Sequence, residues 1–314
     1  MMRIAVCEPA FGRHPVLRAE LLSRYPHATF NEDGRVLAGE TLIGFLKGHQ
    51  RAIVGAQAMN DAVFAAVPEL TVVSKWGVGI DTVDLGAMAR HGVRLGWTPG
   101  VNRLSVAELA LSFFIALLRQ VPAAALEVRG GLWQRRIGRH LSGRTVGIVG
   151  CGHIGKEVVR LLAPFGCRVL AHDIRDYADF YAAHGVEAVG LEDLLKTAEV
   201  VSLHVPLDAT TRGMIDAGRL ALMRPDAILV NTARGGIVDE AALKAALREG
   251  RLAAAACDAF AAEPPADADL LALPNFLATP HIGGSAEEAI LAMGRAAIAG
   301  LADNAVPDPA TAAG

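Results

Sequence analysis

One stretch of this 314-residue chain reads Thr145-Val146-Gly147-Ile148-Val149-Gly150-Cys151-Gly152-His153-Ile154-Gly155, an apolar run that breaks into Gly-x-Gly-x-x-Gly. Gly150 permits a tight turn, Gly152 lets the backbone approach a pyrophosphate, and Gly155 lets the next helix pack closely on the strand. The phosphates can then bind N–H groups at the start of that helix. The stretch therefore predicts a buried strand, a dinucleotide-binding turn and a helix. Its predicted cofactor contacts are Gly150, Gly152, His153, Ile154 and Gly155.

The residues that follow support this interpretation. Residues 156–165 have the pattern of an amphipathic helix, and residues 167–172 read as a second strand that ends at Asp173. A carboxylate at this position can bind both ribose hydroxyls and repel a 2′-phosphate, so the predicted cofactor is NAD rather than NADP. Arg175 weakens this preference, because a basic side chain can accept the phosphate. A glycine-rich turn without a ligand is the alternative interpretation.

Length and composition limit the classes of protein. A chain of 314 residues exceeds one typical core, so two domains are expected. The formal net charge of -3 does not favour a nucleic-acid partner or a polybasic membrane surface. The N-terminal apolar run is too short for a signal peptide, and the longest apolar run, residues 109–118, is flanked by Glu108 and Arg119. We therefore expect a cytoplasmic protein without a membrane partner.

The cysteines lack the spacing of a metal site. Each lies in an apolar or glycine-rich context, so we expect small buried side chains, no disulfide and no bound metal. The four are Cys7, Cys151, Cys167 and Cys257.

The first hundred residues alternate between short apolar runs and helical stretches, which predicts a small α/β unit. The expected strands are residues 3–7, 52–54, 71–75 and 93–95. The third strand continues into Lys75-Trp76-Gly77-Val78-Gly79-Ile80-Asp81, where two glycines leave backbone N–H groups available in a loop. Such N–H groups suit a carboxylate, and an ordinary turn is the alternative.

A long apolar helix is expected over residues 105–119. Ser105 followed by Glu108 resembles a capping box at its start. A helix this apolar must be covered on nearly all sides, either between domains or in a dimer interface. Residues 123–140 then read as a surface arm whose basic side chains are solvated or reach a partner's site. The arm carries Trp133, Arg135, Arg136, Arg139 and His140.

From residue 145 onward, strand and helix signals alternate, which predicts a parallel, doubly wound sheet. The expected strands are residues 145–149, 167–172, 199–204, 227–231, 253–257 and 276–278. The expected helices are residues 153–165, 191–196, 216–222 and 239–249. A further helix over residues 286–301 is expected to return the chain to the first domain, and residues 303–314 read as a frayed end.

Three side chains at strand ends and loops of this sheet are candidates for chemistry. Arg234 follows a predicted strand and is suited to bidentate binding of a carboxylate. Glu263 and His281 lie in loops that contain proline, and an acid beside a histidine can orient the ring for proton transfer. Taken singly, these residues could be a surface arginine, a loop acid and a capping histidine. Their common edge favours an active site.

Taken together, these motifs resemble the D-isomer-specific 2-hydroxyacid dehydrogenase family, and within it the phosphoglycerate dehydrogenase-like branch. The resemblance spans nearly the whole chain. It rests on residues 77–81, 105–108, 150–155, 231–239, 258–264 and 279–284. It implies two doubly wound domains, with a Rossmann NAD-binding domain (residues 101–284) inserted into a flavodoxin-like substrate domain (residues 1–100 and 285–314). It also implies a homodimer through the helix at 105–119 and the arm at 123–140.

The resemblance assigns roles to single residues. It implies that Arg234 binds the substrate carboxylate and polarises the C2 carbonyl, and that His281, partnered by Glu263, exchanges a proton at the C2 oxygen. It further implies that the N–H groups of Val78 and Gly79 bind the carboxylate. The remaining positions that match the NAD cleft are Val205, Pro206, Thr232, Ala233, Asp258, Gly283 and Gly284.

The substrate is the least determined part of this prediction. Where the branch often has an arginine, this chain has Gly55, which removes one phosphate ligand. Lys75, with Arg135 of a partner subunit, could still form a cationic pocket. The expected activity is reversible, NAD-dependent hydride transfer on a small 2-oxo or D-2-hydroxy acid such as glyoxylate or hydroxypyruvate. The alternatives are a D-3-phosphoglycerate dehydrogenase without regulatory domains and an NAD(H)-sensing, corepressor-like binding protein.

Overall fold

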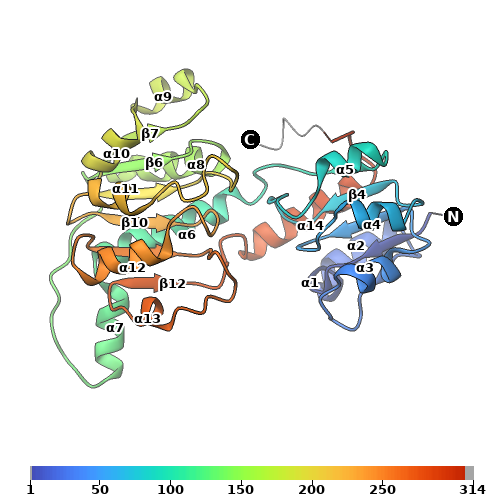
Figure 1. Ribbon diagram of the computed structural model, residues 1–314, viewed down its shortest axis with the longest axis horizontal. Coiled ribbons are helices and arrows are strands. Elements are labelled where there is room, and N and C mark those ends of the chain that lie inside the picture. Colours follow the sequence, from blue (N-terminus) through green and yellow to red (C-terminus); the bar gives the residue numbers. More distant parts are fainter. Residues whose placement is uncertain (1, 308–314) are drawn as a thin grey trace. The chain divides into compact units, whose positions relative to one another are not determined.

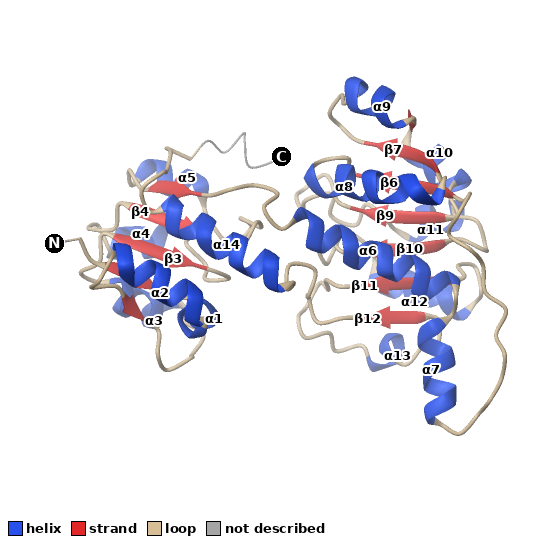
Figure 2. Ribbon diagram, turned by 180° about the vertical axis from the view of Figure 1, so that it is seen from behind, coloured by secondary structure: helices blue, strands red, loops and turns tan. Residues whose placement is uncertain are grey.

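The computed structural model describes residues 2–307 and divides the chain into two compact units. Unit 1 consists of the residues up to Asn102 and those from Ser285 onward, and unit 2 is Arg103–Gly284. Each unit holds one parallel sheet with helices on both faces (Figures 1 and 2). The expected α/β class with two doubly wound sheets is confirmed. The last seven residues of the expected frayed end, 308–314, lie outside the described residues.

The sheet of unit 1 has the strand order β2-β1-β3-β4-β5, with every neighbouring pair parallel. This order is that of flavodoxin-like folds. The strands are β1 (Ile4–Val6), β2 (Thr29–Phe30), β3 (Arg51–Val54), β4 (Val72–Lys75) and β5 (Arg94–Gly96). The two-residue strand β2 was not predicted, because so short a pairing leaves no periodic pattern in the sequence.

Helices cover both faces of this sheet with apolar side chains. One face packs against α3 (Gly39–Leu46), α4 (Asp61–Ala66) and α5 (Leu85–Arg90). The other packs against α1 (Pro9–Arg13), α2 (Pro15–Arg24) and α14 (Glu287–Gly300). The last helix is the predicted closing helix, and it belongs to unit 1 because the Ser74 hydroxyl donates a hydrogen bond to the Ala297 carbonyl at 2.7 Å.

The sheet of unit 2 has the order β12-β11-β10-β9-β6-β7-β8 and is also parallel throughout. Counted from its first strand, this is the Rossmann order, and it reverses direction between β6 and β9. The strands are β6 (Thr145–Val149), β7 (Arg168–His172), β8 (Val186–Ala188), β9 (Val200–Leu203), β10 (Ile228–Asn231), β11 (Ala254–Cys257) and β12 (Phe276–Ala278).

The helices of unit 2 form two layers around this sheet. One face packs against α6 (Arg103–Leu118) and α8 (His153–Leu162). The other packs against α10 (Leu191–Thr197), α11 (Ala217–Leu222) and α12 (Glu240–Arg248). Three short helices lie outside these layers: α7 (Val121–Arg129), α9 (Ala178–His184) and α13 (Ala268–Leu271). Strand β8 and helices α9 and α13 were not predicted, because elements this short leave little periodic pattern in the sequence.

Two sequence expectations need correction. Helix α6 begins at Arg103, so Ser105 lies inside its first turn and cannot cap it. The Ser105 hydroxyl instead donates to the Gly283 carbonyl at 2.6 Å, and the predicted capping box is wrong. Cys167 is only partly buried, whereas the other three cysteines are buried, and all four are free thiols.

The helix lengths and the grouping of possible metal ligands bear on membranes and metals. Within residues 2–307, no single helix is long and apolar enough to cross a membrane, although α6 and α7 together, bent by 65°, meet the length and composition required. Over the same residues, no group of three or more His, Cys, Asp or Glu side chains is arranged to hold a metal ion.

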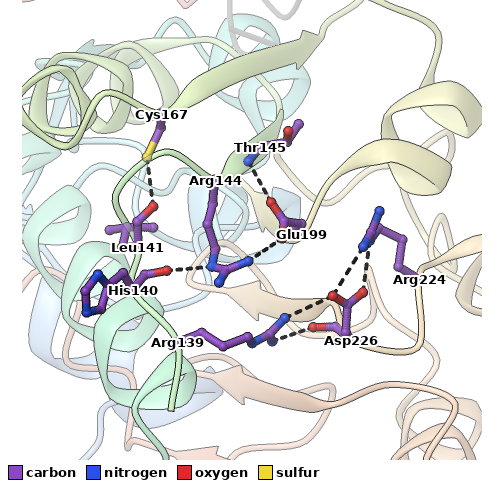
Figure 3. A network of polar contacts seen from close by, with 9 residues as sticks. All are labelled: Arg139, His140, Leu141, Arg144, Thr145, Cys167, Glu199, Arg224 and Asp226. Carbon is purple, nitrogen blue, oxygen red and sulfur yellow. Dashed lines mark hydrogen bonds and ion pairs between the residues drawn. The ribbon is translucent and has the colours of Figure 1, made fainter.

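The predicted arm, residues 123–140, comprises most of α7 and the loop that follows it, and polar contacts hold the end of this loop at the amino edge of the sheet. Figure 3 shows this network. Arg139 donates to the Asp226 carboxylate at 3.1 Å, and Arg224 donates to the same carboxylate, which holds the pKa of Asp226 below its usual value. Arg144 pairs with Glu199, whose other oxygen accepts the Thr145 N–H at 3.1 Å. The arm is therefore anchored at the edge opposite the carboxyl ends of the strands.

The contact between α14 and β5 allows a test of packing in unit 1. A Cβ at Gly96 would lie 2.3 Å from the Gly300 carbonyl oxygen, so Gly96→Ala should lower the free energy of unfolding by about 1–3 kcal/mol. Gly44→Ala is the matched control, because that glycine lies in helix α3 with open space around it and alanine should stabilise by about 0.5–1 kcal/mol. Urea unfolding of both variants measures the difference. Equal midpoints would contradict the close contact.

Candidate active site

The glycine-rich turn of unit 2 lies between β6 and α8, beside the point where the strand order reverses. Gly150 has φ +90°, and a Cβ at Gly155 would lie 2.2 Å from the Gly150 carbonyl oxygen, so both positions need glycine. A Cβ at Gly152 would meet nothing within 4 Å, and this residue caps α8 without a side-chain hydrogen bond. The N–H groups at the start of α8 are therefore open to an anion.

Asp173 follows β7 and braces this turn. One of its carboxylate oxygens accepts the Cys151 N–H at 2.6 Å, and the other accepts the Arg175 N–H at 2.8 Å. A carboxylate has about four acceptor positions, so Asp173 retains capacity for ribose hydroxyls. Asp173 therefore both fixes the turn and lies where a dinucleotide ribose is expected.

Two buried polar atoms without partners lie at the ends of the neighbouring strands β9 and β10. They are Nδ1 of His204 and the hydroxyl of Thr232, and neither has a hydrogen-bond partner within residues 2–307. His204 Nε2 is 2.9 Å from the Ser202 hydroxyl, and burial lowers the pKa of His204 to about 3, so the ring is neutral. Orphaned polar atoms at this edge fit the polar groups of a bound dinucleotide. His204 was missed as a site residue in the sequence, although a histidine at the end of the predicted strand 199–204 was a usable signal.

The other predicted cofactor contacts of unit 2 lie at the same edge. Val205 and Pro206 directly follow His204, and a Cβ at Gly150 would lie 2.8 Å from Val205 Cγ1. Ala233 is buried beside Thr232. The glycine turn, Asp173 and these strand-end residues together fit a dinucleotide.

Arg234 is held in its loop by Asn231, a buried residue at the end of β10. The Asn231 amide donates to the Arg234 carbonyl at 2.8 Å, and its oxygen accepts the Ala233 N–H at 3.1 Å. A Cβ at Gly235 would lie 1.8 Å from the Phe260 carbonyl carbon, so this loop packs directly on the backbone that leads to Glu263. The loops that carry Arg234 and Glu263 are therefore adjacent.

His281 and Glu263 are in contact. Nδ1 of His281 lies 3.0 Å from both carboxylate oxygens of Glu263, one of which also accepts the Phe260 N–H at 3.0 Å. Since the Glu263 carboxylate can only accept hydrogen bonds, Nδ1 carries the proton that it donates to Glu263, and Nε2 is the acceptor of the neutral ring. Nε2 has no hydrogen-bond partner in the part of the chain that the structure describes, and the side chain is about half exposed. The pair can therefore transfer a proton to or from a ligand.

Asp258 fixes the loop on both sides of His281. Its carboxylate is 1% exposed and accepts the Thr279 hydroxyl at 2.6 Å, the Ile282 N–H at 2.8 Å and the Gly283 N–H at 2.7 Å. The resemblance implies that Asp258 lies in the NAD cleft. In the structure, its three hydrogen bonds position the loop that carries His281. Gly283, followed by Gly284, is also held by Ser105 of α6.

The thiols near this edge are not suited to nucleophilic chemistry. Burial raises the pKa of Cys151 to about 11 and that of Cys257 to about 12. Both side chains are therefore protonated at neutral pH.

The predicted carboxylate loop belongs to unit 1 and follows β4. Trp97 donates to the Val78 carbonyl at 2.9 Å, while the N–H groups of Val78 and Gly79 have no hydrogen-bond partner among the described residues. Lys75 is 7% exposed, and its ammonium group donates to the Gly55 carbonyl. The loop can therefore bind an anion through its backbone, and the lysine has a structural contact as well as a charge.

Comparisons with known proteins agree with this geometry. Residues 111–283 match the family described as D-isomer specific 2-hydroxyacid dehydrogenase, NAD binding domain. The D-3-phosphoglycerate dehydrogenase of Methanocaldococcus jannaschii is 38% identical over 263 residues, which is 82% of this chain and 50% of that protein. The chain thus spans about half the length of the curated relatives it matches.

Solved structures are similar over almost the full chain. A protein from Thermus thermophilus has a TM-score of 0.82 and 33% identity, covering 96% of this chain and 94% of that one. A glyoxylate reductase from Paecilomyes thermophila has a TM-score of 0.85 and 26% identity, covering 95% and 93%. These structures share both units of the fold.

Proposed function

Because this chain belongs to the D-isomer specific 2-hydroxyacid dehydrogenase family, we propose that it is an NAD-dependent oxidoreductase that interconverts a 2-oxo acid and a D-2-hydroxy acid. The contact between His281 and Glu263, beside the Arg234 loop and on the sheet edge that carries the glycine turn, supports this proposal most directly. Glyoxylate and hydroxypyruvate are the proposed substrates. The free cysteines suit a reducing compartment, and we place the protein in the cytoplasm.

NAD, when bound, supplies the chemistry of accepting or donating a hydride. The N–H groups at the start of α8 bind its pyrophosphate, and Asp173 binds its ribose hydroxyls. Thr232 and His204 offer buried polar atoms at the adjoining strand ends. The Asp173 charge opposes a 2′-phosphate, so the preferred form is NAD rather than NADP.

The residues of the chain perform the rest of the reaction. Arg234 binds the substrate carboxylate and C2 oxygen, and its positive charge stabilises the negative charge that develops on that oxygen. The N–H groups of Val78 and Gly79 bind the carboxylate. His281 donates a proton from Nε2 to the C2 oxygen during reduction and accepts it during oxidation, while Glu263 holds the ring.

Replacement of His281 tests the proposed reaction. His281 has φ +55°, a conformation that asparagine tolerates, so His281→Asn should fold normally and lower kcat about 100- to 10,000-fold while NADH binding persists. Glu263→Gln should lower kcat by a smaller factor, since the ring loses its anionic partner. His27→Asn, at an exposed turn of unit 1, is the control. Near-normal turnover in His281→Asn would refute the role, and NADH binding without turnover in the wild type would favour a sensor.

Replacement of Asp173 tests the choice of cofactor. Wild type should prefer NADH, and Asp173→Asn should raise the ratio of kcat/KM for NADPH over NADH at least about tenfold, because repulsion of the 2′-phosphate is removed. Asp176→Asn is the control, because it removes a nearby negative charge on a carboxylate that accepts the Ala178 N–H. A wild-type preference for NADPH would be inconsistent with this assignment and would point to Arg175.

We also place a homodimer interface on the predicted arm. Large apolar side chains are exposed along it, with Trp133 86% and Ile137 92% exposed. The others on this segment are Val121, Leu126, Val128 and Leu132. Beside them, a cavity of about 490 Å³ is lined by residues of α6, α7 and the 136–139 segment, together with Phe276. Apolar groups gathered on one projecting segment are typical of an interaction surface, and a second copy of the chain is the proposed partner.

Sedimentation measures this association. Trp133→Asp should shift the protein from dimer to monomer at micromolar concentration, since a charge would be buried without a partner. Val36→Asp, at a residue of unit 1 that is 88% exposed, should leave the dimer intact. A wild-type protein that is monomeric, or a Trp133→Asp variant that remains dimeric, would contradict a dimer interface on the arm.

A further inference from the structure

The carboxyl edge of the unit 1 sheet carries an acidic side chain that the proposed mechanism does not use. Glu8 follows β1, and Gly55 follows the neighbouring strand β3. A Cβ built on Gly55 would lie 2.3 Å from Glu8 Oε2, and all three of its nearest atoms belong to Glu8. The carboxylate of Glu8 thus occupies the space that a side chain at position 55 would need.

Gln57 contacts both Gly55 and Glu8, and these three residues form a corner of the sheet edge. Gln57 is 6% exposed, and its amide oxygen accepts the Gly55 N–H at 2.7 Å, while its amide nitrogen lies 3.5 Å from Glu8 Oε2. The other Glu8 oxygen lies 3.5 Å from the Ala10 nitrogen. Both contacts of Glu8 are long, so its carboxylate retains most of its capacity to accept hydrogen bonds.

The charges at this corner do not favour a second anion. Lys75, at the end of β4, donates its ammonium group to the Gly55 carbonyl. The positive charge of Lys75 and the negative charge of Glu8 therefore flank the same glycine. A phosphate dianion needs more than one fixed cation, because a single charge pair in water contributes only about 0–1 kcal/mol.

Strand order links this corner to the carboxylate loop. The loop with Val78 and Gly79 follows β4, and β3 and β1 are the next strands along the edge, each about 4.8 Å further. On the other side, the end of β5 at Gly96 is covered by the Gly300 backbone. A 2-oxo acid whose carboxylate binds that loop can extend its far end past Gly55 toward Glu8.

We propose that Glu8 is a specificity-determining residue for the far end of the substrate. It accepts a hydrogen bond from a hydroxyl group there, as in hydroxypyruvate, and repels a phosphate dianion. Gly55 leaves the room that this carboxylate occupies, and Gln57 fixes the turn beside it. The inference rests on the proposed function and narrows its substrate class to short 2-oxo acids with a hydrogen-bond donor at the far end.

Steady-state kinetics of Glu8→Gln with NADH test this inference on the full chain. Wild type should prefer hydroxypyruvate to phosphohydroxypyruvate in kcat/KM. Glu8→Gln should raise the ratio of phosphohydroxypyruvate to hydroxypyruvate by about tenfold, and the gain should shrink at high ionic strength because the repulsion is screened. Glyoxylate lacks a far end, so its kcat/KM should stay within about twofold and reports on folding and chemistry.

Two further variants sharpen the result. Glu69→Gln makes the same change of charge at the amino edge of the same sheet, where Glu69 accepts the Gly48 N–H, and should leave the substrate ratio unchanged. Gly55→Arg alone should gain little for the phosphorylated substrate, because Glu8 neutralises the new cation. Gly55→Arg combined with Glu8→Gln should gain more than the product of the single effects.

The outcomes separate the two proposals. An unchanged ratio in Glu8→Gln, with hydroxypyruvate still reduced, overturns the role of Glu8 and leaves the proposed function standing. A wild type that prefers phosphohydroxypyruvate overturns it as well. Failure of the wild type to reduce any 2-oxo acid overturns both.

Discussion

Parallel pairing of all the strands in unit 2 is the constraint on which the rest of the site depends. Parallel strands end at one edge, so residues that are far apart in the chain must meet there. The glycine turn after β6, Arg234 after β10 and His281 after β12 are brought to the same edge in this way. The opposite edge is left for the root of the arm, where Arg139 and Arg144 hold the chain through ion pairs.

Loops at such an edge are precise only when buried groups hold them. Asp258 accepts three hydrogen bonds from the segment that carries His281, and Asn231 makes two within the segment that carries Arg234. Gly235 then brings the Arg234 segment against the backbone before Glu263. These hydrogen bonds join groups within the chain, so they hold the segment that carries the exposed His281 in a defined position.

Much of this could be predicted from the sequence, because the signals are local. The apolar run into the glycine turn, the acid at Asp173 and the strand-end positions of Arg234 and His281 all follow from short patterns. The positioning role of Asp258 and the Glu8 carboxylate beside Gly55 could not be predicted. Each depends on a contact between segments distant in the chain, and the Ser105 hydroxyl similarly binds the distant Gly283 carbonyl rather than capping α6.

The discontinuity of unit 1 has a consequence for biosynthesis. A ribosome completes every residue of unit 2 when it reaches Gly284, but unit 1 still lacks α14 at that moment. Until Gly300 emerges, the face formed by Ser74 and Gly96 has no covering helix, and the apolar cluster of Ile4, Leu17 and Ile53 lacks the side chains that α14 contributes. Although its first part is synthesised before unit 2, unit 1 therefore completes its native core after unit 2, which leaves its apolar face exposed to aggregation and to chaperones for longer.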